Sequence, residues 1–103
     1  MAEVESIPGF NLAAEYAKAS KVSVSFSARA RGYGLFKVGT TGVAPSESDK
    51  PGILSIERRQ KWFAWEAAWK EVDGDYKKAQ ELYIVFVEET NNFEAGHFKK
   101  QSH

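Results

Sequence analysis

The stretch from Pro51 to Trp69 constrains the fold of this chain more than any other. It contains all three tryptophans of the sequence, Trp62, Trp65 and Trp69, which follow one another after three and then four residues. That spacing places the indoles on one side of an α-helix and does not fit one face of a strand. Because aromatic residues at helical spacing most often belong to a core, we expect a helical protein that buries these rings.

The same stretch carries cations beside its aromatic face. Arg58, Arg59 and Lys61 directly precede the first tryptophan, and a Pro-Gly pair upstream indicates a turn. Ser55 is of the residue type that caps helix N-termini. The usual interpretation of such cations is a solvated helix face. An amphipathic helix can nevertheless bury part of an aromatic face and offer the rest to a ligand.

Length and composition exclude several classes of protein. A chain of 103 residues forms one domain with one modest core. Lys plus Arg and Asp plus Glu number 14 each, and a chain without net charge is not suited to general nucleic-acid binding. The absence of cysteine excludes disulfides, thiol nucleophiles and cysteine-ligated metals.

The expected location is the cytoplasm. No apolar run approaches the length of a membrane span, and the first residues are acidic, without the apolar segment of a signal peptide. We therefore expect no stable membrane insertion. His97 and His103, the two histidines, lie in a polar tail without neighbours at metal-ligand spacing, so we expect solvent around them and no bound metal.

The periodicity of apolar residues predicts four helices and no convincing strand. Their expected ranges are about 10–20, 26–40, 55–72 and 76–90. Between the first two helices, residues 22–27 alternate like a short strand, but we interpret them as a loop in which Ser23 or Ser25 caps the second helix. Asp75 is the expected cap of the last helix, and Asn91-Asn92 its stop. Residues 91–103 are polar, and we expect them to be loosely ordered.

Two glycines of the second helix need an explanation. Gly32 and Gly34 each destabilise a helix by roughly 1 kcal/mol relative to alanine. They indicate either a close approach of another element to the backbone or a locally frayed helix, and the sequence does not decide between the two. Residues 39–52 then form a linker that is long for a structureless connection, a type of loop that is often functional.

The sequence contains no catalytic constellation, so we expect no enzyme and no cofactor. Both histidines lie in the tail, which excludes a Ser–His–acid set. Glu88 and Glu89 are neighbours that point in different directions on a helix, and we interpret them as surface charges. No glycine-rich loop has the spacing that binds phosphates.

A binding role fits the residues better. Tyr33 and Lys37 lie one turn apart on the second helix, Lys61 directly precedes a tryptophan, and Lys18 flanks the alanine-rich face of the first helix. Aromatic faces stack on flat heterocycles and cations bind phosphates. Taken singly, each pair reads as a core tyrosine and a solvated lysine. Together with Tyr83 they suggest a surface for a nucleotide-like ligand.

Four motifs in order along the chain resemble the acyl-CoA-binding protein family. They are Tyr33-Gly-Leu-Phe-Lys37-Val-Gly-Thr-Thr-Gly42, Lys50-Pro-Gly52, Lys61-Trp62-Phe-Ala-Trp65 and Ala79-Gln-Glu-Leu-Tyr83-Ile. Phe10 with Ala13-Ala14 also resembles the first helix of that family. The resemblance extends over roughly residues 10 to 90. It implies an all-α, four-helix up-down-down-up bundle, a single acyl-CoA-binding domain over residues 1–103. It also implies a monomer that binds long-chain fatty acyl-CoA, without catalysis, for intracellular transport and pool formation.

The resemblance also implies a binding site, residue by residue. Tyr33 resembles the tyrosine that stacks on the adenine, Lys37 and Lys61 the lysines that hold the 3′-phosphate region, Lys18 a lysine near the phosphates, and Tyr83 the tyrosine that completes the site. The expected ligand-contacting run from Tyr33 to Lys37 includes Gly34, Leu35 and Phe36. Ala14, Arg58 and Arg59 are additional candidates.

Departures from the family motifs support an alternative function. Glu57 stands where the family usually has a lysine, and an anion there weakens phosphate binding unless Arg58 or Arg59 compensates. Arg29 and Ala30 replace large apolar residues along the acyl path, which leaves the chain-length preference open. The alternative is a helical interaction module of the same fold that has lost its ligand. It would contact a protein or an anionic surface through Arg29, Arg31, Arg58 and Arg59.

Overall fold

The computed structural model describes residues 3–101, and within this range it is all-α, with no strand. Its elements are α1 (Phe10–Ala19), α2 (Phe26–Thr41), the short 3₁₀ helix η1 (Glu47–Asp49), α3 (Ile56–Glu71), α4 (Tyr76–Thr90) and α5 (His97–Gln101). The four long helices confirm the predicted bundle. No helix within residues 3–101 has both the length and the apolar character needed to cross a bilayer.

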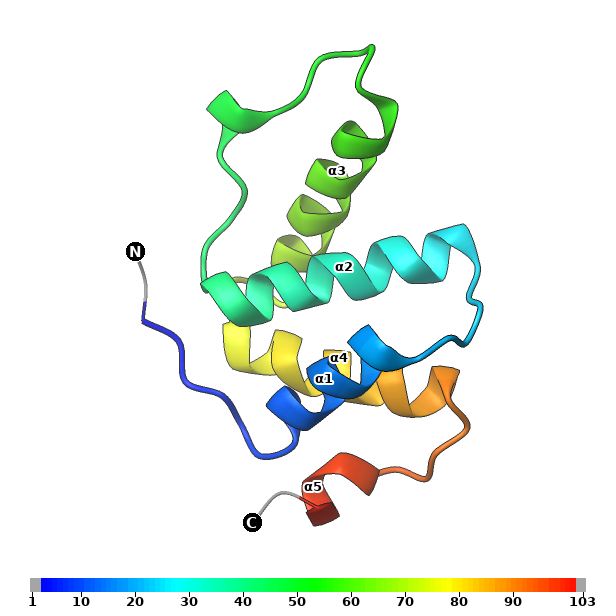
Figure 1. The fold of residues 1–103 in the computed structure, drawn as a ribbon. Coiled ribbons are helices and arrows are strands. Elements are labelled where there is room, and N and C mark those ends of the chain that lie inside the picture. The colour runs from blue at the N-terminus through cyan, green and yellow to red at the C-terminus, as the bar shows by residue number, and fades with distance from the viewer. Residues whose placement is uncertain (1–2, 102–103) are drawn as a thin grey trace.

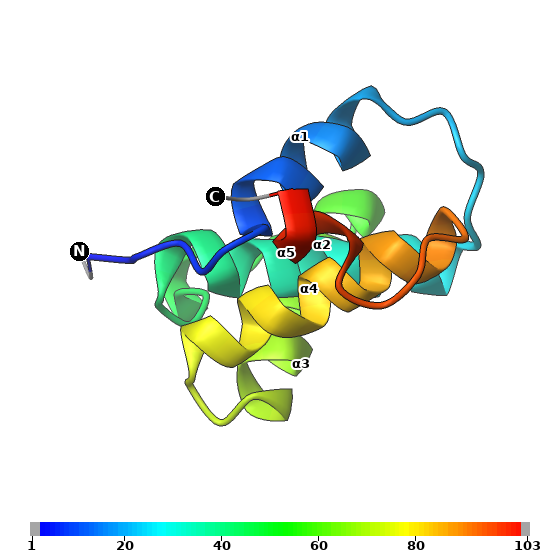
Figure 2. The same cartoon turned by 90° about the horizontal axis from the view of Figure 1, so that it is seen from below.

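The helix α2 is the centre of the bundle. It packs against α3 on one side and α4 on the other, and α1 packs against α4. In Figure 1, α2 and α4 lie side by side and run in opposite directions, and α1 runs the same way as α4. Figure 2 shows α1 and the C-terminal part of α3 on opposite sides of the α2–α4 pair. This arrangement leaves one face of α2 for α3 and directs another toward α1.

Side-chain caps set two of the helix starts where the sequence predicts them. The Ser25 hydroxyl accepts a hydrogen bond from the Ala28 N–H at 3.2 Å, and the Asp75 carboxylate accepts from the Lys77 N–H at 3.1 Å. Each bond satisfies a backbone donor that the first helical turn leaves without a partner. Ser55 occupies the N-cap position of α3, as the sequence predicts, but its side chain makes no capping hydrogen bond.

Close packing explains the two glycines of α2. A Cβ atom built on Gly34 would lie 2.2 Å from the carbonyl oxygen of Ala64 in α3. A Cβ atom on Gly32 would lie 2.5 Å from the ring of Phe86 in α4. Both contacts are shorter than real side chains allow, and α2 is continuous across them. The sequence left a frayed helix open as an explanation, and the structure favours the close approach of α3 and α4.

The tryptophans of α3 attach the long linker to the bundle. The Trp62 indole N–H donates to the Ser46 carbonyl at 2.9 Å, and the Trp65 indole N–H donates to the Val43 carbonyl at 3.0 Å. Only Trp62 is buried, whereas Trp65 and Trp69 are half-buried. The aromatic face of α3 thus has a second role beyond the core, because it orders the connection from α2.

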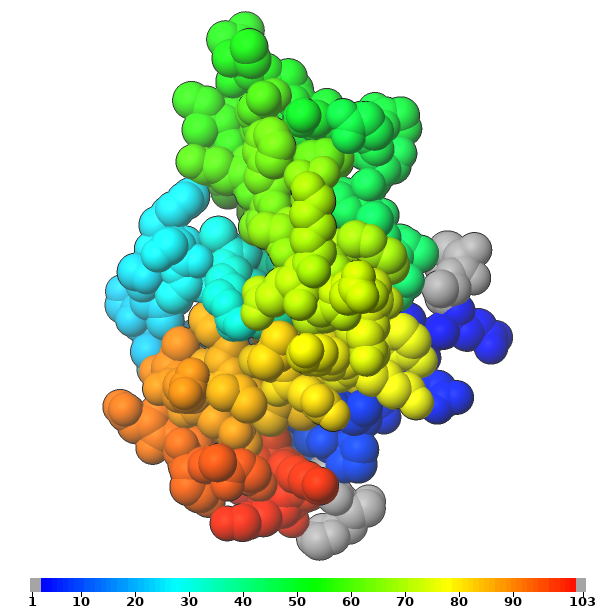
Figure 3. Space-filling view, turned by 180° about the vertical axis from the view of Figure 1, so that it is seen from behind, coloured from blue at the N-terminus to red at the C-terminus, as the bar shows by residue number. Residues whose placement is uncertain are grey.

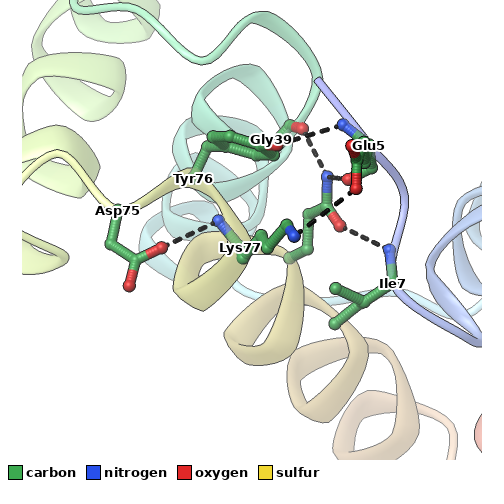
Figure 4. A network of polar contacts seen from close by, with 7 residues as sticks. Glu5, Ile7, Gly39, Asp75, Tyr76 and Lys77 are labelled. Carbon is green, nitrogen blue, oxygen red and sulfur yellow. Dashed lines mark hydrogen bonds and ion pairs between the residues drawn. The ribbon is translucent and has the colours of Figure 1, made fainter. Parts of the chain in front are cut away.

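The N-terminal segment is held by a buried glutamine of α4. The amide of Gln80 is fully buried and donates to the carbonyls of Gly39 at 2.8 Å and Glu5 at 3.0 Å. Its side-chain oxygen accepts from the Ile7 N–H at 2.9 Å. Figure 4 shows these partners, together with the Tyr76 hydroxyl that accepts from the Glu5 N–H at 3.2 Å. One side chain therefore joins α2, α4 and the lead-in to α1.

The C-terminal tail differs from the expectation of loose order. Residues 97–101 form α5, and Phe98 is only 3% exposed in the core. Glu88, interpreted from the sequence as a surface charge, is also only 3% exposed. Its carboxylate accepts from the Gly96 N–H at 3.3 Å and the Phe98 N–H at 3.2 Å. The expected loose tail and the expected surface position of Glu88 are therefore both corrected. Glu88 is buried because its carboxylate caps the helix that carries Phe98 into the core.

His97 is less exposed than the sequence suggested. Its ring stacks on Phe93 at a centroid distance of 3.9 Å and an interplanar angle of 11°. The imidazole Nδ1 lies 3.3 Å from the Glu94 carboxylate, and the His97 side chain is 21% exposed. The other histidine, His103, lies outside the described residues.

Candidate ligand-binding groove

A groove of about 570 Å³ opens between α1, α2 and α4. Its size falls within the range of small-molecule sites. The connection from α1 to α2, at the right of Figure 1, also contributes to it. Most of the lining side chains are apolar, and they include Ala14, Ala17, Val22, Val24, Tyr33, Phe36, Tyr83, Phe86 and Val87.

Aromatic rings of α2 and α4 form the floor of the groove. The rings of Phe36 and Tyr83 have centroids 5.6 Å apart, and those of Tyr83 and Phe86 are 6.2 Å apart. Phe10 packs edge-on against Tyr83, with ring centroids 5.6 Å apart, and also contacts Phe36 at 6.4 Å. Burial raises the pKa of the Tyr83 phenol above its ordinary value, so this floor carries no charge at neutral pH.

The walls of the groove are thin on the side of α1. Ala14 and Ala17 present only methyl groups, which leaves space between α1 and α2. Val22 and Val24 add an apolar edge from the connection. Sequence reasoning missed these two valines as functional candidates because it treated residues 22–27 as a capping loop. Their alternation, which places both on the same side of an extended segment, was the available signal.

Charged side chains stand among the apolar lining residues. Lys18 and Glu15 come from α1, and Arg29 comes from the first turn of α2. None of the three makes an ion pair within residues 3–101. Arg29 thus adds a cation to the groove lining, whereas Ala30, its neighbour in the motif comparison, does not line the groove.

Tyr33 joins the groove to a group of cations on α2 and α3. It lines the groove, and the Lys61 ammonium lies 5.6 Å from the centre of its ring. The Lys37 ammonium, one turn further along α2, lies 4.8 Å from the centre of the Trp65 ring. A cation over an aromatic face is attracted by the negative face of the ring. This contact places Lys61 next to the groove at Tyr33, whereas Lys37 lies over a ring that is not part of the groove lining.

The structure does not bring all predicted site residues to this groove. Leu35 is fully buried in the core, and Gly34 faces the backbone of α3. The Arg59 guanidinium lies over the Phe63 ring, 5.1 Å from its centre, and Arg58 is exposed on the first turns of α3. The predicted residues that line the groove are Ala14, Lys18, Tyr33, Phe36 and Tyr83.

Two of the cations that the sequence singled out are already paired with carboxylates. Glu57 lies 3.7 Å from the Lys61 ammonium, with both side chains largely exposed. Glu71 lies 2.8 Å from the Arg31 guanidinium. Glu57 is therefore positioned to compete with a ligand anion for Lys61, and Arg31 already has a partner.

These features define a class of protein. An apolar groove with an aromatic floor, next to lysines from separate helices, suits an amphiphile with an anionic head and an apolar tail. No group of three or more His, Cys, Asp or Glu side chains within residues 3–101 could hold a metal ion. The site is thus that of a helical binding protein for an anionic amphiphile.

Comparison with known proteins specifies the family. The family model for acyl-CoA-binding protein matches residues 8–87. The chain belongs to this family, whose members are binding proteins and not enzymes.

Two relatives and one solved structure agree with this assignment at similar levels of identity. The chain is 36% identical over 80 residues to the acyl-CoA-binding protein homolog 1 of Caenorhabditis elegans, covering 78% of this chain and 87% of the relative. It is 35% identical over 79 residues to the Drosophila melanogaster homolog, covering 77% and 86%. The crystal structure of Oryza sativa acyl-CoA-binding protein 2 superposes with a TM-score of 0.68 at 33% identity, covering 82% of this chain and 88% of the rice chain.

Proposed function

We propose that this chain binds a long-chain fatty acyl-CoA ester, with the acyl chain in the groove and the CoA headgroup over Tyr33, Lys37 and Lys61. The observation that carries the proposal is the position of Tyr33. It lines the apolar groove and also lies under the Lys61 ammonium at 5.6 Å. A ligand that follows the groove to Tyr33 therefore passes from an apolar to a cationic environment, as the two parts of an acyl-CoA require.

The acyl chain supplies most of the binding free energy in this proposal. Each methylene removed from water contributes about 0.8 kcal/mol. A palmitoyl chain therefore has roughly 10 kcal/mol available before the costs of ordering ligand and protein. The uncharged aromatic floor and the valines of the connection provide the apolar surface for this burial.

The headgroup supplies orientation. A phosphate monoester carries nearly two negative charges at neutral pH, and the diphosphate of CoA adds more. Lys18, Lys37 and Lys61 belong to three different helices, so a headgroup that reaches all three would have cations on several sides. Tyr33 offers a ring face for the adenine. Salt should weaken this part of the binding and leave the apolar part largely unchanged.

The biological role we propose is that of a carrier. A monomer in the cytoplasm would hold the ester with its tail shielded, maintain a pool of it and deliver it to enzymes or membranes. This role needs no chemical step.

Calorimetric titration with palmitoyl-CoA tests the proposal, with free CoA and palmitate as controls. We expect one-to-one binding of the ester and much weaker binding of both fragments. Absence of binding at micromolar protein would contradict the proposal. It would favour the interaction module that has kept the fold and lost the ligand.

A further inference from the structure

Three large aliphatic side chains just before and at the start of α3 are exposed to solvent. Ile53 is 77% exposed, Leu54 97% and Ile56 67%. We call these three residues the apolar tip. The segment that contains them, green in Figures 1 and 3, forms the extremity of the molecule farthest from α5. Single exposed apolar residues are normal on protein surfaces, but a group of this size at one protruding point indicates a contact surface.

The local backbone does not require aliphatic residues at this point. The Ser55 N–H donates to the Gly52 carbonyl at 3.0 Å, which closes a turn with Ile53 and Leu54 at its two corner positions. Glycine, proline, asparagine and aspartate are preferred at such corners because they fit the turn and are solvated easily. Isoleucine and leucine there add nothing to the turn, and neither packs into the core.

The turn is held in place by the first half of α3. The Arg59 guanidinium donates to the Pro51 carbonyl at 3.2 Å. The Lys50 ammonium lies 4.9 Å from the centre of the Phe63 ring, which is itself 39% exposed. Trp62 fixes the linker further back through its bond to Ser46. The apolar tip is therefore presented in a defined position, which lowers the entropic cost of inserting it into a partner.

The charges around the apolar tip favour an anionic partner. Over residues 47–61 four cations stand against three acids, a net charge of +1. Lys50 and Lys61 are each paired with a glutamate, at 3.9 and 3.7 Å. Arg58 and Arg59 make no ion pair within residues 3–101. Arg59 already donates to Pro51 and lies over Phe63, whereas Arg58 is exposed, so the Arg58 guanidinium is the group that remains for an external anion.

We propose that the apolar tip docks the protein onto an anionic lipid bilayer. Ile53, Leu54 and Ile56 enter the boundary between headgroups and acyl chains, while Arg58 binds a lipid phosphate. A convex tip at the extremity of the molecule suits a deformable surface, whereas a folded partner would need a matching cavity and two tips meeting head-on would bury little area. Three aliphatic side chains give reversible binding and not a permanent anchor. The docking does not depend on the proposed acyl-CoA binding.

Co-sedimentation with vesicles of phosphatidylcholine and phosphatidylserine tests this proposal on the chain without ligand. We expect Ile53→Ser with Leu54→Ser to weaken binding about tenfold or more, because the inserted aliphatic surface is lost. Arg58→Gln should weaken binding about fivefold on the anionic vesicles, and it leaves intact the Arg59–Pro51 bond that holds the turn. The matched control is Val85→Ser, since Val85 is 44% exposed on α4, away from the apolar tip. It should bind like the unmodified protein.

A fluorescent label locates the contact. Because the chain has no cysteine, Leu54→Cys and Val85→Cys each accept a single environment-sensitive dye. We expect a blue shift on anionic vesicles at the Leu54 position and none at the Val85 position. The proposal is overturned if the unmodified protein does not bind anionic vesicles, or if the paired Ser substitutions leave binding unchanged. It is also overturned by a concentration-dependent dimer that Leu54→Ser abolishes, which would assign the apolar tip to a second copy. Calorimetry with palmitoyl-CoA on the same variants keeps this result separate from the proposed function.

Discussion

The two faces of α2 are built from neighbouring residues but have different surroundings. Gly34, Leu35 and Val38 are buried against α3, α4 and the core, and we call them the closed face. Tyr33 and Phe36 line the groove, and we call them the open face. Successive residues of a helix point about 100° apart, so a run of consecutive motif residues necessarily divides between faces. The motif from Tyr33 to Lys37 therefore combines residues that build the scaffold with residues that face the groove.

The largest effect is expected on the closed face, from Gly34→Ala. The added Cβ would lie 2.2 Å from a backbone oxygen and 2.8 Å from a backbone carbon of Ala64, so α2 and α3 must separate. We expect the free energy of unfolding in urea to fall by about 3 kcal/mol. Gly52→Ala is the control, because a Cβ there meets nothing within 4 Å. Equal stability of the two variants would contradict the close approach of α2 and α3.

A comparison of Leu35→Ala with Tyr33→Ala tests whether the closed and open faces of α2 have different roles. Leu35 is fully buried, so its truncation should lower the free energy of unfolding by about 3 kcal/mol and leave the affinity of the folded protein nearly unchanged. Tyr33→Ala should instead cost about 1–3 kcal/mol of acyl-CoA affinity. Urea unfolding and calorimetry on both variants separate the two effects. A larger affinity loss for Leu35→Ala would contradict the assignment of Tyr33 to the open face.

Lysine substitutions test how the open face meets the headgroup. Lys61→Ala should reduce palmitoyl-CoA affinity by about 1 kcal/mol, with a smaller dependence of affinity on salt than the unmodified protein. Lys70→Ala is a matched control on the same helix, since Lys70 also pairs with a glutamate one turn before it, at 3.7 Å. Similar losses for both variants would indicate a general charge effect and not a contact at Tyr33.

A smaller gain is expected from removing the competing anion. Glu57 lies 3.7 Å from Lys61, and both groups are largely exposed, so the pair is weak. Glu57→Gln should release Lys61 and raise the affinity by about 0.5 kcal/mol in calorimetry at low salt. Glu66→Gln, which releases Lys70 instead, should leave the affinity unchanged. A loss of affinity in Glu57→Gln would show that Glu57 supports the site.

The smallest effect concerns the pH dependence of stability. Burial raises the pKa of Tyr83 above its ordinary value of 10.0. The folded state therefore holds this proton more tightly than the unfolded state, so the contribution to stability is present below pH 10 and is lost as the pH rises further. Tyr83→Phe should flatten the alkaline part of a plot of unfolding free energy against pH. An unchanged slope in this variant would assign the alkaline loss to other groups.

Much of the fold could be predicted from the sequence because it depends on local patterns. The helix ranges follow from the period of the apolar residues, and the caps at Ser25 and Asp75 follow from residue type. The order of the tail could not be predicted in this way. It depends on Glu88 reaching two backbone donors eight and ten residues further along and on Phe98 entering the core, which are contacts between separate elements.

The site was predictable only in part for a related reason. Periodicity tells which residues turn inward, but it does not distinguish a packed interior from an open groove. Leu35 and Phe36 therefore looked alike in the motif, although one is core and the other lines the groove. Val22 and Val24 became candidates only once the path of the connection between α1 and α2 was known.

Intermolecular NOEs test most directly whether an acyl chain occupies the groove along the open face of α2. The measurement uses palmitoyl-CoA bound to protein with labelled methyl groups. We expect NOEs from the acyl methylenes to the methyls of Val22, Val24 and Val87, which all line the groove. The methyls of Leu35 and Val38, on the closed face, should show none. Tight binding with no NOE to the three groove valines would contradict the central claim.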